Sequence, residues 1–423
     1  MRARLVAARR RPALVKGGSG QNVRRHKPDY FLVLLATALL AIGFVVVYAI
    51  SPGIAASRGV SEQYLISKQI IAIGMSVVSF ILLSVIPLEW WRRAVALLVG
   101  LAGLLTIIAL VTPVNAQYPA HRWVRFAGLS LQTAEFVKLA LIVWAASFFT
   151  ARSARAELNS DSLTFKPIIG VILAIGLVIA GLQSDLGSSA VMVAVLVAIA
   201  FMAGMPLRRF VPLFGAVVAM IAVVLMLSFV VPSLRYRLGR VTSFLHPTSD
   251  CQSTGYQQCQ ALIAVGSGGI FGKGLGKSVQ ANGYLPEAAN DSIFAIMAEK
   301  FGFVGVTIII FIYVALFSRL KRLIERAPSL NARLVVVGLL AWLSTQTIIN
   351  IGAMVGLLPL KGITLPFVSY GGTSLLFVTG ALGLAFQISR YTTYKNHLDS
   401  TPEVALDEQT MRNARPLIVR RNI

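Results

Sequence analysis

Hydrophobic positions fall into ten long apolar runs separated by polar stretches. A helix needs about 20 apolar residues to cross a hydrocarbon core of roughly 30 Å, and each run approaches or exceeds that length. The runs cover about residues 30–50, 65–86, 94–112, 133–150, 167–183, 186–204, 211–231, 291–318, 333–358 and 364–389. The pattern predicts an all-α polytopic membrane protein with about ten transmembrane helices.

The polar stretches divide the chain into a central membrane domain and two tails. We expect a basic tail over residues 1–29, the ten-helix domain over 30–390, and a second tail over 391–423 that is disordered, since its charges alternate without an apolar period. The loop over 231–290, between the seventh and eighth helices, is far longer than the others. Long loops on compact proteins usually carry function.

Lysine and arginine are concentrated in the tails and in alternate loops. The chain has 39 Lys and Arg against 16 Asp and Glu, but only 13% of its residues are charged and 56% are hydrophobic. It therefore lacks the polar surface on which a nucleic-acid-binding protein displays its cations, and we expect no nucleic-acid partner. Because cytoplasmic loops carry the basic excess, we predict that both termini are cytoplasmic and that the 231–290 loop is extracytoplasmic.

Both cysteines, Cys251 and Cys259, lie in this long loop. In an oxidising compartment they could form a disulfide, whereas in the cytoplasm they would stay free thiols. A metal site would need more ligands than these two, and the four histidines have no spacing that supplies them.

The same loop contains a glycine-rich sequence, GSGGIFGKGLGKS, over residues 266–278. A Walker pattern ending in Lys277-Ser278 requires glycine where this chain has Phe271, so the match to a P-loop fails. A glycine-rich turn or re-entrant hairpin is the simpler interpretation. The alternative is that backbone N–H groups, with Lys273 and Lys277, bind a lipid-linked phosphate.

Charged residues within or beside the apolar runs are functional candidates, because a charge at the bilayer centre costs about 2.5–3.5 kcal/mol on insertion scales. Glu135 and Lys138 are three residues apart on one helical face and could form a structural ion pair or serve the site. Arg122 could belong to an interfacial belt or bind a lipid phosphate. Asp185 could cap the sixth helix or be functional.

Two further segments hold polar residues near the predicted outer face. The sequence PLKGITLPFVSYGGTSLL, residues 359–376, predicts irregular backbone, which at membrane depth must be buried in protein or line a cavity that Lys361 and Ser369 would face. In NGYLPEAANDSIFAIMAEKFG, Glu287 and Asp291 lie at the outer mouth of the eighth helix. Glu299 lies deeper, where we expect a structural role.

Taken in order, these segments resemble the SEDS family of shape, elongation, division and sporulation proteins. The sequences that carry the resemblance are RWVRFAGLSLQTAEFVKLALI, QSDLGSSAVM, GSGGIFGKGLGKS, YLPEAANDSIFAIMAEKFGFVG and KGITLPFVSYGGTSLLF. The resemblance implies a peptidoglycan glycosyltransferase that polymerises lipid II on the outer face of the bacterial cytoplasmic membrane, usually beside a class B penicillin-binding protein. The YLPEA sequence resembles division-type more than elongation-type members, which implies a septal location and other divisome proteins as partners.

The family's essential aspartate falls on Asp291. Family members commonly read His-Thr-Asp-Phe there, whereas this chain reads Ala-Asn-Asp-Ser. They also commonly have Glu-Glu where this chain has Glu299 and Lys300. The resemblance therefore implies that the activity is kept, while the surroundings of Asp291 differ from the family's usual ones.

Glycosyl transfer from a lipid pyrophosphate needs a base for the acceptor hydroxyl and cations for the departing pyrophosphate. We expect Asp291 to be that base, or to hold a divalent cation, Mg or Mn. The predicted substrate-binding residues are Arg122, Lys138, Lys277, Glu287, Lys361 and Ser369. The predicted supporting residues are Glu135, Asp185 and Glu299. A lipid II flippase and a non-catalytic division scaffold are the alternative functions.

Overall fold

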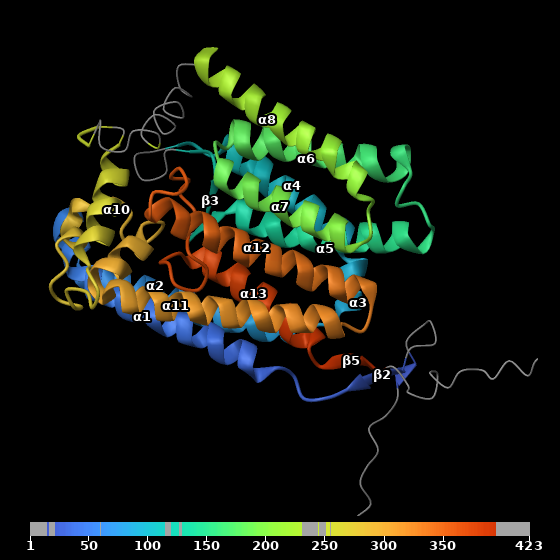
Figure 1. The fold of residues 1–423 in the computed structure, drawn as a ribbon, viewed down its shortest axis with the longest axis horizontal. Helices are drawn as coiled ribbons and strands as arrows, with labels where there is room; N and C mark the ends of the chain where they lie inside the picture. The colour runs from blue at the N-terminus through green and yellow to red at the C-terminus, as the bar shows by residue number, and fades with distance from the viewer. Residues whose placement is uncertain are drawn as a thin grey trace, which may run out of the picture.

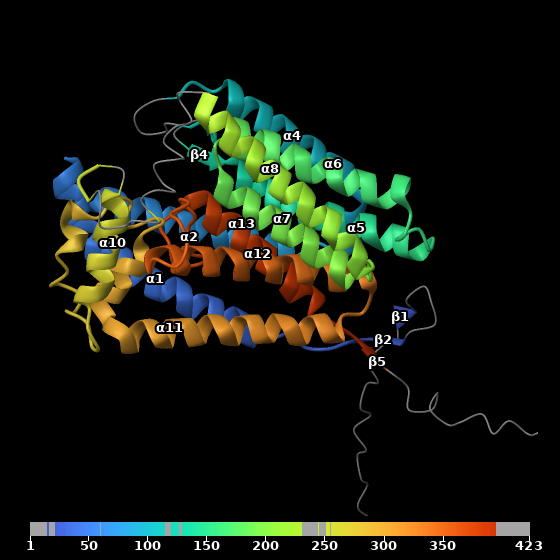
Figure 2. The same ribbon diagram turned by 45° about the horizontal axis from the view of Figure 1, so that its top comes forward.

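Long helices that run side by side make up most of the protein (Figure 1). The computed structural model describes residues 15–16, 22–59, 61–114, 120–126, 129–230, 244, 251–253 and 255–394. Figures 1 and 2 both show α4, α6 and α8 on one side of the structure and α1 and α11 on the other, with α12 and α13 between them.

The helices follow the predicted apolar runs. They are α1 (Tyr30–Arg58), α2 (Glu62–Val85), α3 (Leu88–Arg93), α4 (Val95–Val111), α5 (Thr133–Ala154), α6 (Lys166–Ala174), α7 (Leu186–Met202), α8 (Phe210–Val230), α10 (Tyr256–Ser267), α11 (Ile293–Arg326), α12 (Leu330–Met354) and α13 (Gly372–Ile388). Shorter helical turns are η1 (Asp161–Phe165), η2 (Ile175–Leu182), η3 (Leu207–Arg209) and η5 (Gln280–Tyr284).

Within the described residues, six helical stretches are long and apolar enough to span a membrane, and three shorter apolar helices lie beside them. The six begin at Tyr30, Gln63, Thr133, Asp161, Ile293 and Leu330. This agrees with a multi-pass membrane protein. The count of ten spans and their orientation stay predictions.

Short strands correct the expectation of a purely α-helical chain. β3 (Trp123–Phe126) pairs antiparallel with β4 (Leu129–Gln132) just before α5 and just after Arg122. Apolar and polar residues alternate in LSLQ, the period-two pattern of a half-buried strand, and WVRF is rich in the aromatic and β-branched residues that favour strands. A hairpin therefore precedes α5.

A second small sheet brings the two ends of the described chain together. β2 (Asn22–Arg25) lies between β1 (Val15–Lys16) and β5 (Tyr391–Tyr394), with antiparallel pairing on both sides. The predicted disorder of the C-terminal tail therefore does not hold for its first four residues, whose Tyr-Thr-Thr-Tyr sequence favours a strand. Residues 395–423 lie outside the described part. The pairing places β2, near the start of the described chain, next to β5, its last strand.

Glycines allow close contact between α13 and α2. A Cβ added to Gly383 of α13 would lie 2.6 Å from the carbonyl oxygen of Phe80 in α2, and one added to Gly380 would lie 2.5 Å from Ser79 Oγ. Small residues at membrane helix interfaces let backbones approach and pack, because lipid supplies no hydrophobic driving force between helices.

An irregular segment, residues 355–371, connects α12 to α13. The predicted helix over 364–389 begins only at Gly372, because the prolines and glycines before it cannot continue a helix. Residues 365–369 of the segment are buried, and a Cβ on Gly187 of α7 would lie 3.1 Å from the carbonyl oxygen of Lys361. Irregular backbone is thus buried among helices, as membrane depth requires.

Candidate active site

A hollow lies at the end of the structure where α11 begins and α12 ends. It is small, with room for about one water molecule, and it opens to solvent. Its lining residues come from the turn before α11, the last turns of α12 and the irregular segment: Asp291, Ile349, Asn350, Ala353, Met354, Lys361, Gly362 and Ile363. Asp291 and Lys361, both predicted from the sequence, therefore meet in one place.

Gly362 keeps the space beside the Asp291 carboxylate open. Its φ of 62° is in the left-handed region, which favours glycine. A Cβ at this position would lie 3.6 Å from Asp291 Oδ2. Asp291 and Lys361 are both partly exposed. The hollow thus brings an acidic and a basic residue, both partly exposed, to one place.

Ser369 and Glu287 hold the turn in front of Asp291. The Ser369 hydroxyl donates to the carbonyl oxygen of Asn290 and accepts from the N–H of Leu365, both at 2.7 Å. Glu287 is exposed, and its carboxylate accepts from the side-chain amide of Asn290. Ser369 is therefore committed to protein partners, whereas Glu287 remains accessible beside the site.

Glu135 and Lys138 form a buried ion pair rather than an open site. Lys138 Nζ lies 2.7 Å from Glu135 Oε1 and 3.0 Å from Gln346 Oε1, and the Lys138 side chain has no exposed surface. Gln346 in turn donates to the carbonyl oxygen of Thr364 at 2.9 Å. In this structure, Lys138 acts on the irregular segment through Gln346 and is not accessible to a substrate.

Arg122 and Asp185 connect the β3–β4 hairpin to the turn before α7. The Arg122 guanidinium donates to the carbonyl oxygen of Gln183 at 2.9 Å and to the next carbonyl as well. Asp185 Oδ1 accepts from the N–H of Ser188 at 2.9 Å and so caps α7, while Oδ2 accepts from Gln132 Nε2 at 3.3 Å. Asp185 is buried, so its observed contacts are those of a supporting residue.

Glu299 fixes the glycine-rich loop to α11. Its fully buried carboxylate accepts from Lys273 Nζ at 3.0 Å and from the N–H groups of Val279 and Gln280 at 3.0 and 3.2 Å. The hydroxyl of Ser278 donates to it as well. Four donors from one loop therefore converge on a single buried acid.

Close packing against α11 explains the glycines at positions 268 and 272 of the loop. A Cβ on Gly268 would lie 2.0 Å from the carbonyl oxygen of Ala298, and one on Gly272 would lie 2.2 Å from that of Lys300. The loop backbone therefore lies directly against the backbone of α11, at a place where α11 is interrupted by Gly302 with φ 66°. Only residues without side chains fit this contact.

The contact with α11 also occupies backbone N–H groups of the loop that would be needed to bind a phosphate. The backbone N–H groups of Lys273 and Gly274 donate to the carbonyl oxygens of Glu299 and Lys300, each at 2.9 Å. Lys277, in contrast, is exposed. The loop geometry therefore favours the glycine-rich turn, with Lys277 left as its accessible cation.

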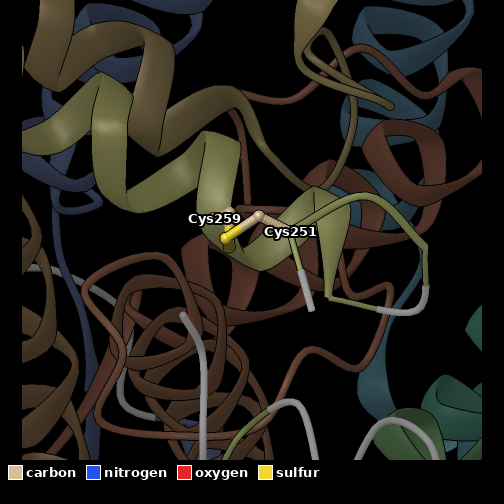
Figure 3. Close-up of a disulfide and its surroundings, with 2 residues drawn as sticks. All are labelled: Cys251 and Cys259. Carbon is tan, nitrogen blue, oxygen red and sulfur yellow. A yellow bond between two sulfur atoms is a disulfide. The ribbon is translucent and has the colours of Figure 1, made fainter. Parts of the chain in front are cut away.

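Cys251 and Cys259 are joined by a disulfide at the start of α10 (Figure 3). Their Cα atoms lie 5.6 Å apart. α10 packs on the rest of the protein through Ala261 and Ala264, which are fully buried. The disulfide thus ties the preceding chain to a helix at the same end as the hollow.

Comparison with known proteins identifies the family. A family model described as "Cell cycle protein", which covers FtsW, RodA and SpoVE, matches residues 30–394. The chain belongs to the SEDS family. Stage V sporulation protein E of Bacillus subtilis (strain 168) is 35% identical over 374 residues, 88% of this chain and 99% of the relative. The probable peptidoglycan glycosyltransferase FtsW of Thioalkalivibrio sulfidiphilus is 36% identical over 368 residues, 86% of this chain and 90% of the relative.

Solved structures share the SEDS fold. A chain from a structure described as "Structural coordination of polymerization and crosslinking by a peptidoglycan synthase complex" matches with a TM-score of 0.67 at 28% identity, over 86% of this chain and 98% of that one. The rod shape determining protein RodA of Thermus thermophilus matches with a TM-score of 0.59 at 27% identity, over 86% and 97%. This SEDS protein is therefore a multi-pass protein of the bacterial cytoplasmic membrane.

Sequence reasoning missed two site residues, Gln346 and Asn350 of α12. Both are buried, and both hold the irregular segment by hydrogen bonds to its backbone. They are uncharged, so a search for charges inside apolar runs passes over them. Their spacing of four residues puts them on one helical face, a signal that such a search could have used.

Asp291 is the carboxylate that lines the hollow, so a divalent cation there would take its other ligands from water or from a substrate pyrophosphate. Among the described residues there is no group of three or more His, Cys, Asp or Glu side chains that could hold a metal ion. The hollow is lined by one lysine, Lys361, as well as by Asp291. Mg²⁺ prefers oxygen ligands in octahedral geometry, and an ammonium group nearby opposes it. We therefore derive no step through Mg or Mn.

Proposed function

We propose that this SEDS protein polymerises lipid II into glycan strands on the outer face of the cytoplasmic membrane, with Asp291 as the base. Its assignment as a glycosyltransferase rests on relatives: several about 36% identical proteins are named probable peptidoglycan glycosyltransferase FtsW. The structural observation that carries the proposal is the hollow in which Asp291 and Lys361 meet.

The geometry supports a division of labour between these two residues. The Asp291 carboxylate takes the proton of the acceptor sugar hydroxyl as that oxygen attacks the anomeric carbon of the donor. The bond from that carbon to the pyrophosphate breaks, and the Lys361 ammonium stabilises the charge that develops on the departing lipid pyrophosphate. A positioned base is typically worth about 10²–10⁴ in rate.

The other predicted cations have weaker claims. Arg122 is bound to backbone carbonyls and Lys138 is fully buried, so neither offers a free charge to the pyrophosphate in this structure. Lys277 is exposed on the glycine-rich loop and Glu287 is exposed just before Asp291. We assign Lys277 and Glu287 to contacts with the lipid headgroup or the sugars outside the hollow.

We further propose a role in septal cell-wall synthesis with a class B penicillin-binding protein and other divisome proteins. Several relatives carry the name FtsW, and one matching structure is described as a complex that combines polymerization with crosslinking. The SpoVE relative is a sporulation protein by name, so the family match alone leaves more than one developmental role. Imaging a fluorescent fusion distinguishes septal from peripheral location.

Incubation of the purified protein with lipid II tests the enzymatic proposal. The mixture is analysed for glycan polymer with and without the partner transpeptidase. We expect polymer from the wild type and essentially none from Asp291→Asn, with equal expression of both. A lipid II flippase would leave lipid II unconsumed, and a non-catalytic scaffold would allow Asp291→Asn to complement a strain that lacks the protein.

A further inference from the structure

Asp291 is held in place by three consecutive carbonyl groups. The carbonyl oxygen of Ala289 accepts from the N–H of Tyr370 at 2.8 Å, and that of Asn290 accepts from the Ser369 hydroxyl at 2.7 Å. The carbonyl oxygen of Asp291 itself accepts from Asn350 Nδ2 at 2.7 Å. Donors from α12 and from the irregular segment therefore fix the backbone of the whole turn.

Asn350 connects both halves of the hollow. The same Nδ2 also donates to the carbonyl oxygen of Ile363 at 2.6 Å, in the segment that carries Lys361. Two carbonyl oxygens on one end of the amide require a donor there, so that end must be the NH₂ group, and both of its hydrogens are used. One side chain thus sets the separation between the turn of Asp291 and the segment of Lys361.

The burial of Asn350 indicates that this bridge has a purpose beyond filling space. Its side chain is 2% exposed, and its Oδ1 has no hydrogen-bond partner. A buried polar group without a partner costs roughly 1–3 kcal/mol, a cost that an apolar side chain does not have. The amide is therefore explained by the two hydrogen bonds that its NH₂ group donates to the carbonyl oxygens of Asp291 and Ile363.

We propose that Asn350 is a positioning residue that aligns Asp291 with Lys361 for glycosyl transfer. The inference rests on the proposed function. It also gives a reason why the turn can read Ala-Asn-Asp-Ser: the backbone clamp at residues 289–291 orients the aspartate without a side chain from position 289. Misplacement of a reacting group by about 1 Å can cost about 10²-fold in rate.

Asn331 provides a matched control on the same helix. It is also buried, at 4% exposed, its Oδ1 likewise has no hydrogen-bond partner, and it lies near the opposite end of α12. Asn350→Leu and Asn331→Leu therefore make the same chemical change at equal burial. Only the first removes donors from the turn of Asp291.

Initial rates of lipid II polymerisation per folded molecule test the role. The full-length variants are purified in one detergent, and the folded fraction is taken from thermal unfolding. For Asn350→Leu we expect kcat to fall at least about tenfold with KM within about threefold of wild type. Asn331→Leu should change the unfolding temperature but keep the wild-type kcat. Wild-type kcat in folded Asn350→Leu, or an equal loss in both variants, overturns the proposal.

A second substitution at Asn350 keeps the test decisive if Asn350→Leu does not fold. If Asn350→Leu does not fold, Asn350→Asp keeps the shape but sets an acceptor against two carbonyl oxygens, and it should lose at least as much kcat; an unchanged kcat overturns the role.

The double variant Ser369→Ala with Asn350→Leu should lose less kcat than the product of the two single losses, because both donors hold one turn. A wild type that makes no polymer overturns the proposed function itself.

Discussion

Replacement of Gly268 by alanine should destabilise the protein through a clash that can be read from the structure. The added Cβ would lie 2.0 Å from the carbonyl oxygen of Ala298 and 2.8 Å from its carbonyl carbon, whereas ordinary contacts of a Cβ are 3.4–4 Å. The backbone of α11 must therefore move by more than 1 Å. Overpacking of this kind costs about 1–3 kcal/mol and occasionally more.

For Gly266, two residues earlier, we expect alanine to have the opposite effect on stability. It lies inside α10, and a Cβ there would meet nothing within 4 Å. Alanine in a helix is favoured over glycine by about 0.5–1 kcal/mol, so Gly266→Ala should be neutral or stabilising. The pair of variants therefore separates a steric effect from a general effect of losing glycine in this loop.

Thermal unfolding of the purified variants in one detergent measures both effects. We expect Gly268→Ala to unfold below the wild type and Gly266→Ala at or above it, with unchanged affinity for lipid II per folded molecule in both. Shifts of the same sign in both variants would refute the packing argument. A specific loss of lipid II affinity in Gly268→Ala would instead favour a phosphate-binding loop.

Three further variants test other parts of the account. Lys361→Met should reduce lipid II polymerisation about tenfold or more per folded molecule, since it removes the cation of the hollow; unchanged kinetics would remove Lys361 from the site. Glu299→Ala should cost about 3–5 kcal/mol of folding free energy in chemical unfolding, because it leaves buried donors without their acceptor, and a stability equal to wild type would contradict the anchoring role. Replacing both Cys251 and Cys259 by serine should cost about 2–3 kcal/mol or less, as for a short closed loop; a wild-type protein whose unfolding is unaffected by reductant would argue against the disulfide.

Much of the helical framework follows from the apolar runs, because membrane helices satisfy their own backbone and need only length and hydrophobicity. The sequence also pointed to Asp291 and Lys361, since charges near apolar segments are costly enough to be conspicuous. Both line the same hollow. What the sequence did not contain is the distance between the two segments, which depends on tertiary packing around α12.

Local signals were weaker where backbone contacts decide the structure. The β3–β4 hairpin has only four residues in each strand, a signal that the longer apolar pattern of α5 hides. The tenth apolar run starts at residue 364, but the helix starts at Gly372, because proline and glycine override hydrophobicity there. The glycine-rich loop resembled a ligand site until its backbone contact with α11 explained the glycines.

Buried polar partners were the hardest to foresee. Lys138 reads as a candidate phosphate ligand from its sequence position, yet its ammonium group is enclosed by Glu135 and Gln346. Asn350 gives no sequence signal of its own, because an amide within an apolar run can face lipid, a cavity or another helix. Its partners are carbonyl groups, which every residue carries, so only the fold identifies them.

The initial rate of lipid II polymerisation by Asp291→Asn tests the central claim most directly. The matched control is Asp161→Asn, the same change at an acid between α5 and α6, where Asp161 forms only a largely exposed pair with Arg209. We expect a fall of about 10²–10⁴ in rate for Asp291→Asn and a near wild-type rate for Asp161→Asn, at equal folded fractions. A polymerisation rate for Asp291→Asn equal to that of the wild type would contradict the claim.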